Sequence, residues 1–124
     1  MILITGGVFQ GKLDFARERY GLRPEEIFRC TGTDVDFSRR CICNLESYTR
    51  ACAREGRDSR SLFEQAPEAW KDRILICRDI SGGVVPLGAD MRAWQRENGS
   101  LCQYLAERAD RVLRIFCGLE QRLK

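Results

Sequence analysis

The stretch Ile2-Leu3-Ile4-Thr5-Gly6-Gly7-Val8-Phe9-Gln10-Gly11-Lys12-Leu13 decides the fold of this chain. Residues 2–5 form a short apolar run, which is typical of a strand buried on both faces of a parallel sheet. Two glycines follow this run and predict a tight turn. From residue 12 to residue 20, apolar side chains recur every three or four positions and a glycine follows, which predicts a helix that ends there.

The rest of the chain repeats this alternation of strands and helices. Short apolar runs predict further strands at residues 27–30, 74–77 and 112–117, while helical spacing covers residues 44–54, 59–70 and 88–109. Pro67 is expected to break the second of these helices into two pieces. With 124 residues and no internal repeat or linker, the sequence predicts one α/β domain over residues 1–124, with a mostly parallel central sheet.

The loop from Gly6 to Lys12 fits the phosphate-loop pattern G-x4-G-K between a predicted strand and a predicted helix. In such a loop the backbone N–H groups bind phosphate oxygens, assisted by the positive end of the helix dipole. The predicted binding residues are Gly6, Gly7, Val8, Phe9, Gln10, Gly11, Lys12 and Leu13, with Lys12 on the β and γ phosphates. Leu13 stands where such loops carry a Ser or Thr that ligates Mg²⁺. The alternative is a glycine turn that binds no ligand.

Three aspartates are candidate catalytic residues. Asp79 closely follows the predicted strand 74–77, a place from which a carboxylate can reach Mg²⁺, although it is equally consistent with a surface acid paired with Arg78. Asp34 and Asp36 follow the second predicted strand, and carboxyl ends of parallel strands line ligand crevices. Either is a candidate base for a substrate hydroxyl. Asp36 is also a candidate turn cap.

Composition excludes several kinds of chemistry. The chain has no histidine, which removes histidine nucleophiles, histidine acid–base catalysis and the common zinc sites that use histidine. A net charge of +3 is too small to indicate a nucleic-acid or membrane partner. The chain shows neither an export signal nor a long apolar span, so a cytoplasmic location is expected. The seven cysteines fit reduced thiols, although Cys41-Ile42-Cys43 leaves a metal site open.

Four large side chains in the second half of the chain have two interpretations each. Trp70 and Trp94 are expected in the core rather than as platforms that stack on a base. Arg92 and Arg96 lie one helical turn apart, so together they can reach one phosphate, but such pairs more often form a solvated helix face.

The glycine loop and the last third of the chain together resemble the adenosylcobinamide kinase/adenosylcobinamide-phosphate guanylyltransferase family. That family carries Asn-Glu-Val-Gly-x-Gly-Ile-Val-Pro after an apolar strand, where this chain has Arg78-Asp79-Ile80-Ser81-Gly82-Gly83-Val84-Val85-Pro86. The similarity continues without a gap to the end of the chain, at Arg92, Trp94, Gly99, Cys102-Gln103-Tyr104-Leu105-Ala106, Ala109-Asp110-Arg111-Val112, Gly118 and Lys124. It covers the first 16 residues and those from about 74 onward.

The resemblance implies a P-loop NTPase-like three-layer sandwich, ATP or GTP with Mg²⁺ as cofactors, a corrinoid acceptor and a homo-oligomer. It also implies Lys12 at the γ-phosphate and Asp79 at Mg²⁺, where the family has a glutamate. Leu13 replaces the family's serine, and Cys102 replaces its asparagine. The family transfers a guanylyl group through a histidine, which this chain lacks, so that step is not expected. Two hypotheses stay open: a cobinamide kinase-like phosphotransferase, and a non-catalytic protein that binds a nucleotide or a partner.

Overall fold

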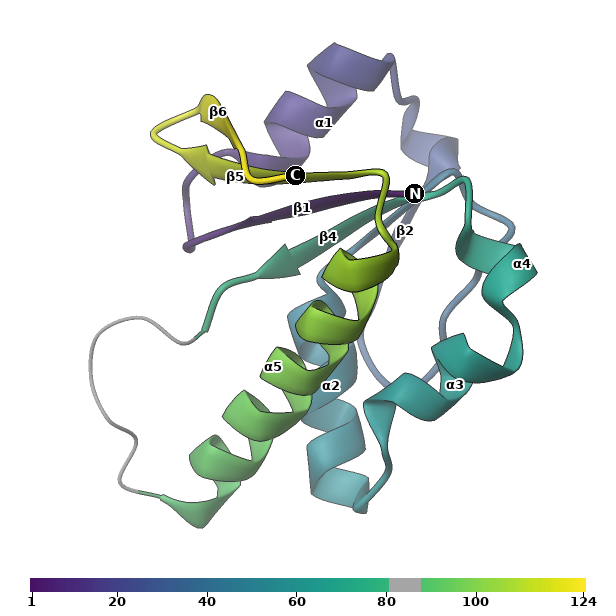
Figure 1. The fold of residues 1–124 in the computed structure, drawn as a ribbon, viewed down its shortest axis with the longest axis vertical. Coiled ribbons are helices and arrows are strands. Elements are labelled where there is room, and N and C mark those ends of the chain that lie inside the picture. The colour runs from purple at the N-terminus through teal and green to yellow at the C-terminus, as the bar shows by residue number, and fades with distance from the viewer. Residues whose placement is uncertain (81–87) are drawn as a thin grey trace.

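A computed structural model describes residues 1–80 and 88–124. Figure 1 shows a single twisted sheet with helices on both sides. The sheet contains β1 (Ile2–Gly6), β2 (Ile27–Arg29), β3 (Cys41–Cys43), β4 (Ile74–Arg78), β5 (Arg111–Phe116) and β6 (Leu119–Arg122) in the order β2-β3-β4-β1-β5-β6. All neighbouring strands are parallel except β5 and β6, which form an antiparallel hairpin. The predicted α/β class with a mostly parallel sheet is confirmed.

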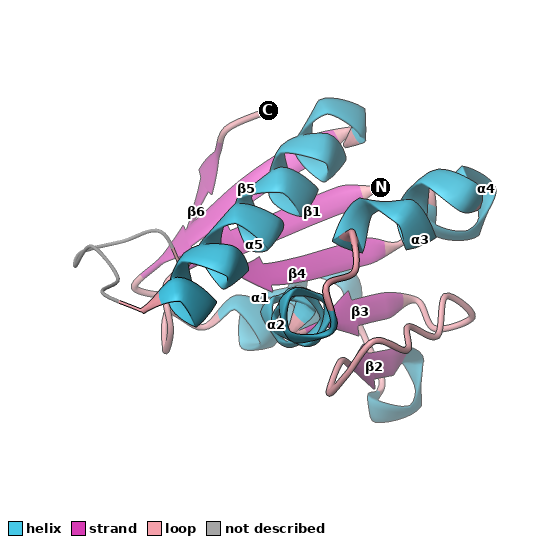
Figure 2. Cartoon of the chain, turned by 90° about the horizontal axis from the view of Figure 1, so that it is seen from below, coloured by secondary structure: helices cyan, strands magenta, loops and turns pink. Residues whose placement is uncertain are grey.

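The helices divide unequally between the two faces of the sheet. Helix α1 (Lys12–Tyr20) covers one face of the sheet. The other face carries α2 (Leu45–Glu55), α3 (Ser59–Gln65), α4 (Pro67–Trp70) and α5 (Ala89–Arg108). A short 3-10 helix spans Pro24–Glu26. In Figure 2, α5 lies over the face of the sheet and runs in nearly the same direction as β5 and β1. Helices on both faces are compatible with a three-layer sandwich. As predicted, Pro67 separates two helices.

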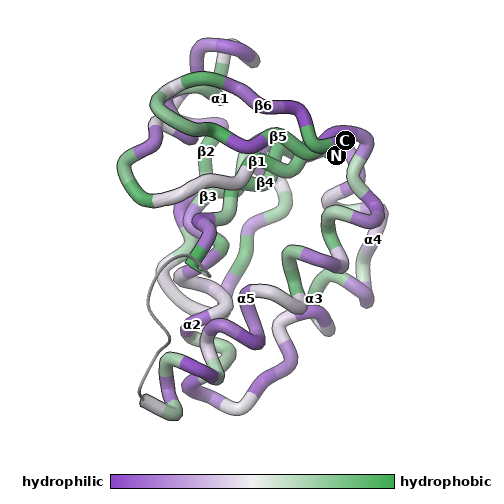
Figure 3. Tube along the Cα trace, turned by 60° about the vertical axis from the view of Figure 1, so that its left-hand side comes forward, coloured by the Kyte–Doolittle hydropathy of each residue, from purple (hydrophilic) through white to green (hydrophobic). Residues whose placement is uncertain are grey.

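Two apolar clusters, one on each face of the sheet, form the core. Successive residues of a strand enter opposite clusters, as strand geometry requires: Leu3 packs under α2 and α5, whereas Ile4 packs under α1. Figure 3 shows hydrophobic segments along the central strands and hydrophilic ones along β6. In the described part of the chain, no helix has the length and apolar character needed to cross a membrane.

Strand β3 was not predicted, and it explains the Cys41-Ile42-Cys43 motif. Cys41 and Cys43 join the cluster beneath α1, and Ile42 points into the opposite cluster, so the spacing of the two cysteines is the two-residue period of a strand. Burial raises the pKa of the Cys41 thiol to about 12. Within residues 1–80 and 88–124, no group of three or more histidine, cysteine or acidic side chains is placed to hold a metal ion.

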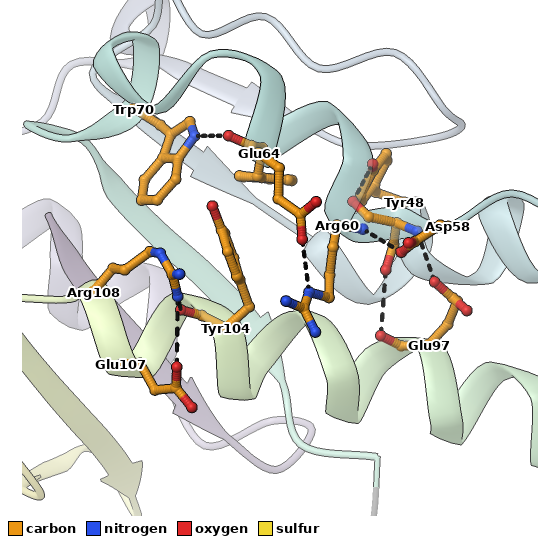
Figure 4. A network of polar contacts seen from close by, with 11 residues as sticks. Tyr48, Asp58, Arg60, Glu64, Trp70, Glu97, Tyr104, Glu107 and Arg108 are labelled. Carbon is orange, nitrogen blue, oxygen red and sulfur yellow. Dashed lines mark hydrogen bonds and ion pairs between the residues drawn. The ribbon is translucent and has the colours of Figure 1, made fainter.

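A polar network joins α3 to α5 at the outer end of the core (Figure 4). The backbone N–H of Ser59 donates to Glu97 Oε1 at 2.6 Å, and the Tyr48 hydroxyl donates to the Ser59 carbonyl oxygen at 2.7 Å. The guanidinium groups of Arg60 and Arg108 lie 4.9 Å and 3.8 Å from the centre of the Tyr104 ring. These contacts fix α5, the helix that also carries Trp94 into the site described below.

Candidate phosphate-binding site

The loop between β1 and α1 has the backbone of a tight glycine-rich turn. Phe9 and Gly11 adopt positive φ angles of 60° and 86°, and α1 begins directly after Gly11, at Lys12. Val8 and Phe9 project toward solvent, with Phe9 96% exposed. Among the described residues, the backbone N–H groups of Gly7, Val8, Phe9 and Gly11 donate no hydrogen bond to the protein backbone outside helices and strands, and the first N–H groups of a helix such as α1 have no partner inside it. A row of free amides at a helix start can bind an anion.

Backbone contacts hold the loop at both ends. The carbonyl oxygen of Gly6 accepts a 2.8 Å hydrogen bond from the Asp79 amide, just past the end of β4. At the other end, Gln10 accepts from the turn between β5 and β6: its carbonyl from the Gly118 amide at 3.0 Å, and its side-chain oxygen from the Cys117 amide at 2.6 Å. The loop is therefore fixed by segments from three parts of the sequence.

Lys12 lies across this loop. Its Nζ donates to the carbonyl oxygen of Gly7 at 2.7 Å, and its side chain is partly buried. Burial lowers the pKa of Lys12, the negative charge of Glu46 opposes this effect, and the positive charge of Arg78 adds to it. The charges of Glu46 and Arg78 thus both act on the Lys12 ammonium within one site.

An open pocket of about 350 Å³ adjoins the loop and brings these charges together. The side chains that line it include Phe9, Lys12, Glu46, Arg50, Arg78 and Trp94. Three of them are cationic and only Glu46 is anionic. Among the described residues, no carboxylate lies within ion-pair distance of Lys12, Arg50 or Arg78. The pocket therefore has a surplus of positive charge that suits an anionic ligand.

Glu46 is a member of the site that the sequence did not reveal. It lies in the first turn of α2 and is only 9% exposed, which is rare for a glutamate. Its Oε1 accepts a 2.8 Å hydrogen bond from the Arg78 amide, and its backbone carbonyl accepts one from Trp94 Nε1 at 2.9 Å. An acid in a helical pattern looks like a solvated position, so the sequence alone gives no signal of this burial.

Asn98 supports the site from behind through a buried polar network. Its Oδ1 accepts from the Thr49 hydroxyl at 2.8 Å and from the Cys77 thiol at 3.2 Å, while its Nδ2 donates to the Arg78 carbonyl at 3.2 Å. Trp94 Nε1 also approaches the Thr49 hydroxyl at 3.2 Å. Because these polar groups are paired and buried, α2, β4 and α5 are held in one arrangement around the pocket.

The predicted aspartates do not line this pocket. Asp79 is exposed and adjoins the loop through the hydrogen bond of its amide to the Gly6 carbonyl oxygen. Asp34 is exposed in the segment between β2 and β3 and does not line the pocket. Asp36 was expected at the carboxyl ends of the strands, and this placement is wrong. The carbonyl oxygen of the next residue, Phe37, accepts a hydrogen bond from Arg73, which directly precedes β4; Asp36 therefore lies near the N-terminal ends of the strands, whereas the loop follows the C-terminal end of β1.

The alternative interpretation of Asp36 as a turn cap agrees with its contacts. Its Oδ1 accepts from the amide and the hydroxyl of Ser38, at 3.0 Å and 2.6 Å, and it forms an ion pair with Arg39. The Ser38 hydrogen bonds are the main cause of a lowered pKa of the Asp36 carboxyl.

The structure also gives the burial or exposure of the other residues that the sequence singled out. Leu13 packs against the cluster beneath α1, so its side chain belongs to the core. Trp70 and Trp94 are buried, 3% and 7% exposed, as expected. Arg92 and Arg96 are exposed on α5. The segment Ser81-Gly82-Gly83-Val84-Val85-Pro86 of the family resemblance lies outside the described residues.

Comparison of the sequence with models of known protein families and with curated proteins gives no significant match. The site is therefore interpreted from its own residues.

Proposed function

We propose that the loop of residues 6–13 binds the polyphosphate of ATP or GTP, and that the protein transfers the terminal phosphoryl group to a hydroxyl acceptor. The observation that carries this proposal is the tight glycine-rich turn that leads directly into α1, with the Nζ of Lys12 bonded back to the Gly7 carbonyl oxygen across it. Lys12 already bonds a carbonyl oxygen of the loop, and a phosphate oxygen would offer its ammonium a stronger, charge-assisted partner. The resemblance to adenosylcobinamide kinase supports the same reaction and suggests a corrinoid as the acceptor.

The residues near the loop fit a Mg²⁺ ion carried in by the nucleotide. Such an ion keeps several waters and takes most other ligands from phosphates, so one or two protein carboxylates suffice. Glu46 lines the pocket and Asp79 adjoins the loop, and either carboxylate would supply the oxygen ligand that Leu13 cannot. When bound, Mg²⁺ neutralises negative charge that develops on the phosphates.

Calorimetric titration with ATP and with GTP, each with and without Mg²⁺, tests the binding step. We expect saturable binding that weakens at least about 10-fold in Lys12→Ala, because a charge-assisted hydrogen bond is worth roughly 1.5–3 kcal/mol. Lys71→Ala is the matched control, since Lys71 is an exposed lysine paired with Glu68. If neither nucleotide binds below millimolar concentration, the proposal is wrong.

One observation favours a second function, nucleotide binding without catalysis. Leu13 has no hydroxyl at the position that normally holds Mg²⁺, and its side chain packs against the apolar cluster beneath α1. Incubation with labelled ATP and adenosylcobinamide, or another hydroxyl compound, separates the two functions, because only the phosphotransferase forms labelled product. Labelled GTP is expected to leave the protein itself unlabelled, since the chain has no histidine to accept a guanylyl group.

A further inference from the structure

We infer that the pocket formed by Glu46, Arg50, Arg78 and Trp94 is the acceptor subsite, and that the acceptor is a small alcohol carrying a phosphate or carboxylate group. This inference rests on the proposed function, because it assigns the second substrate of the same reaction. It differs from the corrinoid suggested by the resemblance, since a cobinamide carries uncharged amide side chains and offers no anion to the two arginines.

The two arginines share one aromatic ring. The Cζ atoms of Arg50 and Arg78 lie 5.4 Å and 5.6 Å from the centre of the Trp94 indole, within the range of cation–π attraction. Both arginines also line the same pocket, and among the described residues neither has a carboxylate partner. A guanidinium group is planar and can donate two hydrogen bonds to one phosphate or carboxylate, so an anion in this pocket has suitable donors on both arginines.

The base of this subsite is rigid before any ligand arrives. Trp94 is fixed by the hydrogen bonds of its Nε1, and Arg78 is fixed through its amide to Glu46 and through its carbonyl to Asn98. Because the Trp94 ring and the backbone of Arg78 are held by these bonds, the base of the subsite needs little further ordering when an anion binds, which favours affinity. Arg50 is exposed on α2 and can adjust to ligands of different length.

Glu46 gives this subsite a group for proton transfer. Its carboxylate lies in the same pocket as Lys12, the residue expected at the γ-phosphate. In the reaction, the acceptor oxygen forms a bond to the γ-phosphorus while the bond from that phosphorus to the β–γ bridging oxygen breaks. The nucleoside diphosphate leaves with that electron pair, and the hydroxyl proton passes to the Glu46 carboxylate. The arginines hold the anionic end of the acceptor and so orient the hydroxyl for in-line attack.

Inorganic phosphate is the probe for this subsite, measured with the loop occupied by a saturating non-hydrolysable ATP analogue and Mg²⁺. We expect one further binding event, seen by calorimetry and by a change in tryptophan fluorescence that is lost in Trp94→Phe, where Trp70 remains. Arg50→Gln and Arg78→Gln should each weaken phosphate binding about 10-fold, the loss of one charge-assisted contact.

Two variants sharpen the result. Arg54→Gln is the matched control, because Arg54 lies one turn further along α2 and does not line this pocket. Glu46→Gln removes the only negative charge among the described residues that line the pocket, and it should tighten phosphate binding while slowing phosphoryl transfer. If wild-type protein binds no phosphate in this assay, or if both arginine variants bind it as wild type does, the inference is overturned.

A separate arm distinguishes failure of this inference from failure of the proposed function. Phosphate is titrated into Lys12→Ala without nucleotide, so that the loop contributes little. Phosphate binding that depends on Arg50 and Arg78 in this variant supports the subsite even if ATP and GTP do not bind the wild type. Nucleotide binding without this phosphate binding supports the proposed function and rejects the acceptor assignment.

Discussion

Gly6 lies directly against the backbone of Ile115, so that a Cβ atom added to Gly6 would be 2.5 Å from the Ile115 carbonyl oxygen. Gly6 also has a φ angle of +149°, which is strained for any residue with a side chain. Both residues belong to paired strands of the sheet, so neither backbone can easily move aside. Because of this close approach, the start of the loop packs against the backbone of β5.

Replacing Gly6 by alanine is therefore expected to destabilise the protein by about 2–4 kcal/mol, the range for a strained backbone combined with overpacking. Urea unfolding of Gly6→Ala measures this effect. Gly7→Ala is the control, because its Cβ would meet only the flexible Gln10 side chain, at 3.6 Å. Equal stability of the two variants would contradict the close approach.

Two tyrosines differ in whether their hydroxyl groups are satisfied. The Tyr20 hydroxyl is buried and has no hydrogen-bond partner among the described residues, whereas the Tyr48 hydroxyl donates to the Ser59 carbonyl at 2.7 Å. An unsatisfied buried polar group costs about 1–3 kcal/mol, so Tyr20→Phe should raise the free energy of unfolding. Tyr48→Phe should lower it by about 1 kcal/mol. Thermal unfolding of both variants compares them, and a loss of stability in Tyr20→Phe would point to a missed partner.

Gly99 lies inside α5, and none of the described residues comes within 4 Å of a Cβ added there. Because glycine in a helix interior costs about 1 kcal/mol relative to alanine, Gly99→Ala is expected to stabilise the protein by about that amount. Chemical denaturation measures the change. A decrease in stability would instead show that something packs against this position.

The lowered pKa of Lys12 predicts a pH dependence of phosphate binding. Burial disfavours the protonated amine, so in the free protein Lys12 loses its proton below the ordinary value of 10.5. Only the protonated form attracts phosphate, and nucleotide affinity should therefore fall as pH rises toward 10.5, with at most one proton involved.

Titrations between about pH 8 and pH 10 measure this dependence, a range in which the nucleotide phosphates no longer titrate. Lys12→Arg is the control, because its guanidinium stays protonated throughout. If wild type and Lys12→Arg show the same pH profile, Lys12 is not the titrating group.

Two short strands, β3 and β6, could not be predicted from hydrophobic periodicity. Strand β3 has only three residues, too few for a period to appear, and it forms because β2 and β4 pair with it on both sides. Strand β6 has four exposed residues and no apolar alternation. It is created by the turn at Cys117 and Gly118, whose φ angles of 52° and 75° suit a two-residue hairpin.

The candidate site divides in the same way. The glycine loop and Lys12 are recognisable in the sequence because the strand, the turn and the helix that form them are contiguous. Glu46, Arg50, Arg78 and Trp94 come from three separate elements, and each one alone resembles a surface charge or a core residue.

By itself, the sequence determined the strand–loop–helix unit at the start, most of the later elements and the absence of histidine chemistry, because these depend on local periodicity and on composition. Only the tertiary structure decided which charges share a pocket. In that structure Glu46 is buried in the same pocket as Lys12, and Asp36 lies near the opposite ends of the strands. The position of a side chain is set by how distant segments pack together.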